Sequence, residues 1–227
     1  MTHIPGAWRV DARRTYDYLQ GGKLRRLMNC LRAPGVQAAL VLRLGQWLKT
    51  QSIVLRVFLE PGYFVLNGLV KILWGIELPR GARIGSGLYI GHFGGITVSS
   101  EAVIGANCNL SQNITIGVSG FGETGGVPVI GDNVYIAPGA RLFGRITIGN
   151  NVKIGANTVI SSDVPDNAIA VLDPGFRIVS LKGNRYEVPQ PIREGTPPEV
   201  RSAIPDRAKT KVQESSHIAR VAAAKRC

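Results

Sequence analysis

Aliphatic residues recur every six positions in the second half of this chain, and this period restricts the fold more than any other feature. The recurring residues are Ile130, Ile136, Leu142, Ile148, Ile154 and Ile160. A period of six suits neither an isolated helix nor an alternating strand, but it is typical of a β-helix built from short repeats. In such a fold the aliphatic side chains point into a narrow prism, and three blocks complete one triangular coil. The pattern therefore predicts a mainly β solenoid of hexapeptide repeats.

The same pattern occurs upstream in two other registers. Their aliphatic positions are Ile84, Ile90, Ile96, Ile104, Leu110 and Ile116. The spacing between the registers is not a multiple of six, so residues are inserted after residue 96 and again after residue 116. The second insertion predicts a glycine-rich loop over 117–129 that projects from the prism. Loops on rigid scaffolds often carry function, although a tolerated surface insertion would give the same pattern.

Three segments are expected along the chain. Residues 1–75 read as helical, residues 76–180 form the β-helix, and the basic, proline-containing tail 181–227 is expected to lack fixed structure. The apolar stretch 53–74 is interrupted by charges and Pro61, which makes it a poor membrane span. We expect it to belong to a buried helix pair that caps the prism, and the alternative is an amphipathic anchor lying on a membrane. The first ten residues contain no apolar run, which argues against a signal peptide.

Charge and cysteine content restrict the partners and the compartment. The net charge is +12, from 27 basic and 15 acidic residues, and much of the excess lies outside the repeats. No basic stripe with interleaved aromatic residues follows the solenoid, so we expect no nucleic acid partner. Cys30, Cys108 and Cys227 are odd in number and lack metal-ligand spacing, which favours a reducing, cytoplasmic location. Cys108 takes the small fifth position of its repeat and is expected to fill the core.

One histidine within the repeats is the candidate general base. His92 stands at a corner between Gly91 and the pair Gly94–Gly95, where small neighbours leave room for a ligand. Histidines at such corners are often merely solvated. An acidic residue, Glu77, precedes the first coil, and a carboxylate beside an imidazole stabilises its charged form. The sequence alone does not bring Glu77 to His92.

Three segments of the chain resemble a known family. GIELPRGARIGSGLYIGHFGGI, NLSQNITIG and VYIAPGARLFGRITIGNNVKIGANTVI resemble the serine acetyltransferase branch of the hexapeptide acyltransferases over about half the chain. The resemblance implies a left-handed parallel β-helix and acetyl-CoA as donor, bound between the subunits of a homotrimer. It also implies that His92 removes a proton from the acceptor hydroxyl and that Glu77 takes the place of an aspartate partner. The implied donor-binding positions are Gly117, Gly120, Ala137, Lys153, Ala156 and Arg177.

Three positions depart from that family and change the expected acceptor. Gly91 replaces an aspartate that helps to hold serine, and Gly126 and Val127 replace an Arg–His pair that contacts serine and its carboxylate. Chains of the YIGHFGG type resemble acetyltransferases of bacterial polysaccharide biosynthesis, so we expect a sugar hydroxyl as acceptor. Serine O-acetylation for cysteine synthesis is the main alternative, and a non-catalytic solenoid is a second. No metal is expected, and peripheral membrane contact through the N-terminal helices is left open.

Overall fold

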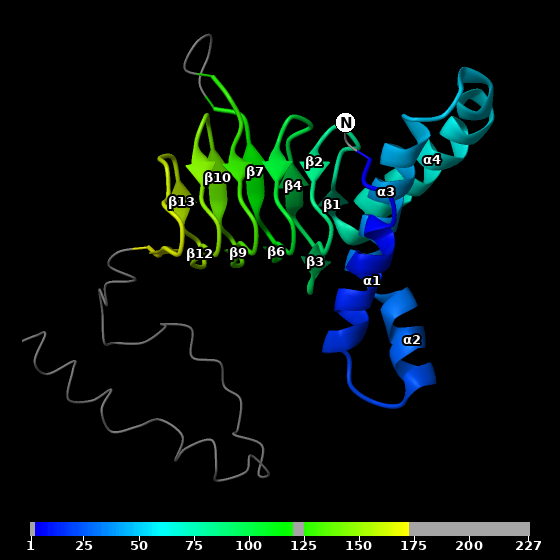
Figure 1. Ribbon diagram of the computed structural model, residues 1–227, viewed down its shortest axis with the longest axis horizontal. Helices are drawn as coiled ribbons and strands as arrows, with labels where there is room; N and C mark the ends of the chain where they lie inside the picture. Colours follow the sequence, from blue (N-terminus) through cyan, green and yellow to red (C-terminus); the bar gives the residue numbers. More distant parts are fainter. Residues whose placement is uncertain (1–2, 120–124, 173–227) are drawn as a thin grey trace, which may run out of the picture. The chain divides into compact units, whose positions relative to one another are not determined.

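The computed structural model describes residues 3–119 and 125–172 of the 227-residue chain. The predicted tail 181–227 lies outside these residues. Four helices come first: α1 (Ala7–Tyr18), α2 (Lys23–Arg32), α3 (Pro34–Leu48) and α4 (Ile53–Trp74). The strands begin directly after α4 and run along one axis away from the helices (Figure 1).

Fourteen short strands follow among the described residues, and they form three parallel sheets. The first sheet contains β1 (Ile76–Glu77), β4 (Ile96–Val98), β7 (Thr115–Gly117), β10 (Arg141–Phe143) and β13 (Val159–Ile160). The second contains β2 (Arg83–Ile84), β5 (Val103–Ile104), β8 (Val129–Ile130) and β11 (Thr147–Ile148). The third contains β3 (Tyr89–Ile90), β6 (Asn109–Leu110), β9 (Tyr135–Ile136), β12 (Lys153–Ile154) and β14 (Ile169–Ala170). The predicted left-handed β-helix of hexapeptide repeats is confirmed.

The repeat positions explain why the chain turns where it does. The recurring aliphatic side chains are all at most 7% exposed and form one continuous core along the prism. Cys108 is fully buried in this core, as its repeat position predicts. Six asparagines adopt the left-handed conformation, among them Asn133 and Asn151, which few residues other than glycine tolerate. Three of them form a side-chain ladder along one edge, in which Asn133 Nδ2 donates to Asn151 Oδ1 at 3.2 Å and Asn151 Nδ2 donates to Asn167 Oδ1 at 3.1 Å.

The first coil would expose the unpaired backbone groups of a sheet edge, and the helices satisfy them. Arg43 of α3 donates to the carbonyl oxygens of Ile84 at 2.7 Å and Gly85 at 2.6 Å. Asp11 of α1 pairs with Arg43 at 2.8 Å and accepts a 2.8 Å hydrogen bond from the Leu88 amide. Both charged side chains are at most 4% exposed. The cap built from α1 and α3 therefore supplies charged partners to the first coil, while Ala38, Ala39 and Leu42 of α3 join the apolar core of the prism.

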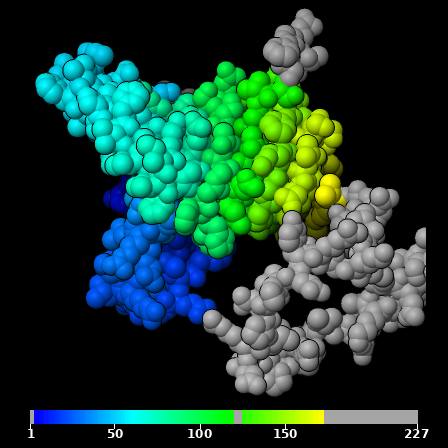
Figure 2. All heavy atoms as spheres, turned by 180° about the vertical axis from the view of Figure 1, so that it is seen from behind, coloured from blue at the N-terminus to red at the C-terminus, as the bar shows by residue number. Residues whose placement is uncertain are grey.

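The expectation of a buried helix pair is wrong for α4. Only Tyr63 and Val70 of this helix are buried, because α4 touches α3 and β1 along a narrow strip and projects beyond them (Figure 2). Phe58 and Ile72 are 76% and 82% exposed. Within the described ranges, α4 alone has the length and the apolar composition of a helix that crosses a membrane. Only 11% of its most apolar 18-residue stretch is buried. Core helices of soluble proteins can pass the same test.

The predicted projecting loop leaves the prism between the first and second sheets. It follows β7 and returns at β8, and its two arms are joined by an antiparallel bridge between Ser119 and Gly126 (Figure 1). The amide of each bridged residue donates to the carbonyl of the other, at 3.2 and 3.1 Å. Residues 120–124, which include Gly120, lie outside the described residues.

Candidate active site

The His92 corner is held in place by its aromatic neighbour. Phe93 packs edge-to-face on Trp74 at the end of α4, with ring centroids 5.3 Å apart. The Trp74 indole nitrogen donates to Gln37 Oε1 of α3 at 3.0 Å. Gly94 and Gly95 then turn the chain into β4 with φ values of 100° and 65°, which glycine adopts without strain. The helical cap and the glycine turn together determine where His92 lies.

His92 opens onto a pocket of about 180 Å³ at the end of the third sheet. The pocket is lined by Tyr89, Gly91, His92, Asn109, Leu110, Ser111 and Tyr135. Within the described ranges the imidazole of His92 has no hydrogen-bonding partner and its residue is exposed. The side-chain oxygen of Asn109 is buried and has no hydrogen-bonding partner among residues 3–119 and 125–172. A buried acceptor of this kind is normally satisfied, so the pocket offers an unpaired polar group to a bound molecule.

Tyr89 fills the space beside Gly91. A Cβ atom at Gly91 would lie 3.2 Å from both the ring edge and the hydroxyl oxygen of Tyr89. Tyr89 also stacks on Tyr18 of α1, with centroids 4.6 Å apart. Burial raises the pKa of the Tyr89 hydroxyl, Tyr18 adds to this, and Arg14 opposes it. The hydroxyl therefore remains a proton donor at neutral pH, next to the position that a side chain of residue 91 would take.

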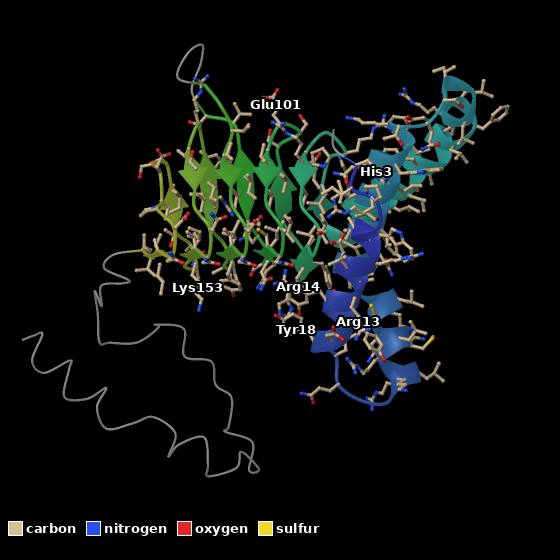
Figure 3. All side chains as sticks on the ribbon, in the orientation of Figure 1. His3, Arg13, Arg14, Tyr18, Glu101 and Lys153 are labelled. Carbon is tan, nitrogen blue, oxygen red and sulfur yellow. The ribbon has the colours of Figure 1, made fainter. Side chains whose placement is uncertain are left out.

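Three of the remaining predicted site residues lie along one edge of the prism or on the third sheet. The corners after β3, β6, β9 and β12 stack in register, through hydrogen bonds from Asn113 to Gly94 at 2.7 Å and from Asn157 to Pro138 at 2.9 Å. Ala137 and Ala156 belong to this edge, which begins at His92. Lys153 is exposed on the outer row of the third sheet, next to Tyr135 in the strand register (Figure 3).

Two predicted residues lie elsewhere on the first sheet. Glu77 faces outward from β1 beside Thr97, and its carboxylate is 2.5 Å from Lys71 Nζ rather than paired with His92. Gly117 ends β7 at the prism edge between the first and second sheets, away from His92, and a Cβ atom there would lie 3.0 Å from the ring of Phe143. Gly120 and Arg177 lie outside the described residues. The role of each of these residues stays a prediction.

Arg145 lies beside Gly126, one of the two loop positions that lack the Arg–His pair of the family pattern. A Cβ atom at Gly126 would lie 2.7 Å from Cβ of Arg145, so a side chain at 126 would displace Arg145. Arg145 is exposed at the corner that follows β10, next to the base of the loop. The pattern of repeats does not reveal this approach, because it joins residues nineteen positions apart. Within residues 3–119 and 125–172 no cluster of His, Cys, Asp and Glu could hold a metal ion.

Several known proteins are similar to this chain in sequence. Residues 128–162 match the bacterial transferase hexapeptide model of six repeats. A serine acetyltransferase from Synechococcus elongatus is 35% identical over 154 residues, 68% of this chain and 60% of the relative. A serine acetyltransferase from Helicobacter pylori is 34% identical over 141 residues, 61% of this chain and 77% of the relative. The chain thus spans less than two thirds of the first of these relatives.

Two solved structures have the same fold. The serine acetyltransferase of Neisseria gonorrhoeae in complex with serine has a TM-score of 0.58 and 27% identity, covering 74% of this chain and 66% of that one. The serine acetyltransferase of Brucella abortus in complex with coenzyme A has a TM-score of 0.60 and 29% identity, covering 74% and 64%.

The expectation of a sugar acceptor is wrong, because these relatives are serine acetyltransferases and one holds serine. That expectation took the absence of side chains at Gly91 and Gly126 as the absence of a pocket. In the structure Tyr89 and Arg145 occupy the neighbourhood of these two glycines. The findings favour the alternative, serine O-acetylation, over transfer to a glycan.

Proposed function

This chain belongs to the serine acetyltransferase family of hexapeptide transferases, and we propose that it transfers the acetyl group of acetyl-CoA to the hydroxyl of L-serine. The observation that carries the proposal is the 34% identity across 77% of a serine acetyltransferase, together with the open pocket at His92. The products would be O-acetyl-L-serine and free coenzyme A.

His92 would act as the general base. Its imidazole takes the proton of the serine hydroxyl as that oxygen forms a bond to the thioester carbonyl carbon. The carbon–sulfur bond then breaks, and the imidazolium returns the proton to the departing sulfur, so that the enzyme ends unchanged. General-base assistance of this kind contributes about 10²–10⁴-fold. The exposed imidazole without a hydrogen-bonding partner among the described residues leaves the base open to substrate.

The edge that starts at His92 would hold the donor. This edge runs from the corner after β3 to the corner after β12. That distance is three inter-strand spacings, about 14 Å at the usual strand spacing. Ala137 and Ala156 are small, so an extended thiol arm could lie against the backbone there. Gln112 Oε1, on the same edge, and Asn109 Oδ1, in the pocket, are buried and have no partner in the part of the chain that the structure describes, so both would accept hydrogen bonds from amides. Lys153 supplies an exposed cation for a phosphate of coenzyme A.

Serine would be recognised by groups that differ from those of the family pattern. We assign the Tyr89 hydroxyl to a polar contact with serine, because its oxygen lies 3.2 Å from the position that a Cβ atom of residue 91 would take. We assign Arg145 to the carboxylate of serine, because it adjoins the loop position that lacks an arginine. Arginine matches a carboxylate through two parallel hydrogen bonds, which makes it a suitable replacement.

One subunit would not complete this site. His92 lies on the prism edge where the chain enters the strands of the first sheet. The loop and Arg145 lie on the prism edge where the chain leaves these strands. Both groups can face one serine only if a second subunit brings its loop against the His92 edge. We therefore propose a homotrimer in which each site is shared by two subunits, as cyclic symmetry allows.

The test is identification of the product. Purified protein is incubated with acetyl-CoA and an equimolar mixture of L-serine, L-threonine and L-homoserine, and the acetylated products are resolved by mass spectrometry. O-acetyl-L-serine is expected as the main product. A dominant product other than O-acetylserine, from protein that binds coenzyme A, would overturn the assignment of serine while keeping acetyl transfer.

A further inference from the structure

Helix α2 carries an apolar stripe that no described part of the chain covers. Leu24, Leu27, Met28 and Leu31 are 74%, 49%, 43% and 54% exposed. At about 100° of rotation per residue these four side chains share one arc of the helix, about 100° wide. Four large apolar side chains on one short helix are a contiguous exposed patch, which usually marks an interaction site.

Basic side chains border this stripe on both sides. Arg25 and Arg32 follow Met28 around the helix, and Lys23 precedes Leu27 on the other side, by the same rotation of about 100° per residue. All three are exposed, and α2 contains no acidic residue. The arrangement is an apolar face with cationic flanks.

The opposite face of α2 is the one that attaches it to the protein. Cys30 is buried, with its sulfur 3.4 Å from the Ala12 carbonyl of α1. Arg26 donates to the Tyr16 carbonyl at 2.6 Å and lies over the Tyr16 ring, 4.1 Å from its centroid. These contacts orient the helix, so the stripe points away from α1. In Figures 1 and 2 the α1–α2 pair forms a protrusion beside the β-helix.

We infer that α2 docks on an acidic lipid bilayer, with its stripe inserted between the headgroups and Lys23, Arg25 and Arg32 on their phosphates. The charge complementarity commits the surface to a membrane, because a helix with an apolar face and basic flanks is suited to the headgroup boundary. The exposed apolar side of α4 lacks this signature. Its charged residues are paired, Arg56 with Glu60 at 3.4 Å and Lys71 with Glu77 at 2.5 Å. The inference stands independently of the acceptor of the acetyl group.

Vesicle sedimentation of the full chain tests the inference. Vesicles of phosphatidylcholine alone are compared with equimolar phosphatidylcholine and phosphatidylglycerol at physiological salt. The wild-type chain is expected to sediment with the acidic vesicles and to remain in solution with the neutral ones. The triple variant Leu24→Ser, Leu27→Ser, Leu31→Ser should bind the acidic vesicles at least about tenfold more weakly.

Two double variants distinguish membrane binding through α2 from binding through the overall positive charge of the chain. Arg25→Gln with Arg32→Gln should weaken binding by about tenfold or more, because each basic residue near an acidic surface contributes a severalfold gain. Arg83→Gln with Arg145→Gln removes the same charge from exposed positions on the β-helix and should leave vesicle binding nearly unchanged. Circular dichroism confirms that each variant is folded.

Three outcomes would overturn the inference. The wild-type chain could fail to sediment with acidic vesicles, or the α2 and β-helix charge pairs could weaken binding equally. The triple leucine-to-serine variant could also bind vesicles as the wild type does but elute as a smaller oligomer. That result would mean that the stripe contacts a second copy of this chain.

Discussion

The position of Tyr89 explains why a glycine stands at residue 91. Gly91 removes a side chain from the pocket, but the Tyr89 ring and hydroxyl lie 3.2 Å from the position that this side chain would take. Burial raises the pKa of this hydroxyl, so it stays protonated and donates across the neutral pH range. The glycine is therefore better described as making room for a tyrosine than as opening an empty space.

The variant Tyr89→Phe should raise the KM for serine by roughly tenfold, because it removes one hydrogen bond to the substrate, worth about 1.5 kcal/mol. The KM for acetyl-CoA should change little. Tyr135→Phe is the matched control, since Tyr135 lines the same pocket two coils along the third sheet. Equal effects of the two variants on the serine KM would remove Tyr89 from serine recognition.

At the scale of elements, α1 and α3 close the end of the β-helix by supplying charged partners to its backbone. Arg43 and Asp11 are both buried, and together they satisfy two carbonyl groups and one amide of the first coil. Breaking a buried ion pair by removing one partner is costly, because the other charge stays buried without compensation.

Arg43→Met should accordingly lower the free energy of unfolding by about 3–5 kcal/mol, measured by urea denaturation. The control is Arg83→Met, which removes an exposed arginine of the adjacent strand β2 and should cost less than about 1 kcal/mol. A loss for Arg43→Met as small as that of the control would mean that the ion pair does not hold the cap.

Sequence patterns predicted the elements unevenly, and the reasons are physical. The hexapeptide period located each coil, because one aliphatic residue per block is enough to define the inward face. His92 was found because it is the single histidine of the repeats. Tyr89 and Arg145 were missed, since their approach to Gly91 and Gly126 depends on side-chain packing that the period does not record. The exposure of α4 was missed as well, because an apolar composition does not reveal what covers a helix.

At the scale of the whole molecule, the two halves of the proposed site lie on opposite edges of the first sheet. The described part of one subunit carries His92 at one edge and Arg145 at the other. The proposed trimer brings the second edge of each subunit against the first edge of its neighbour. This arrangement makes activity a property of pairs of subunits.

Mixing two inactive variants tests the shared site. His92→Ala and Arg145→Ala should each be nearly inactive as pure trimers. Equal amounts unfolded together and refolded should recover about a quarter of the wild-type activity, because three quarters of random trimers are mixed and each holds one intact site in three. The pure variants carried through the same refolding are the controls. Absence of recovery from mixed trimers would show that each subunit builds its own site.

The most direct test of the central claim is the rate of thiol release from acetyl-CoA with L-serine as acceptor. We predict serine-dependent release by the wild-type chain and a turnover at least about a hundredfold lower for His92→Ala, with coenzyme A binding retained. No serine-dependent release from wild-type protein that binds coenzyme A would contradict the proposed function. Near-normal turnover by folded His92→Ala would contradict the proposed base.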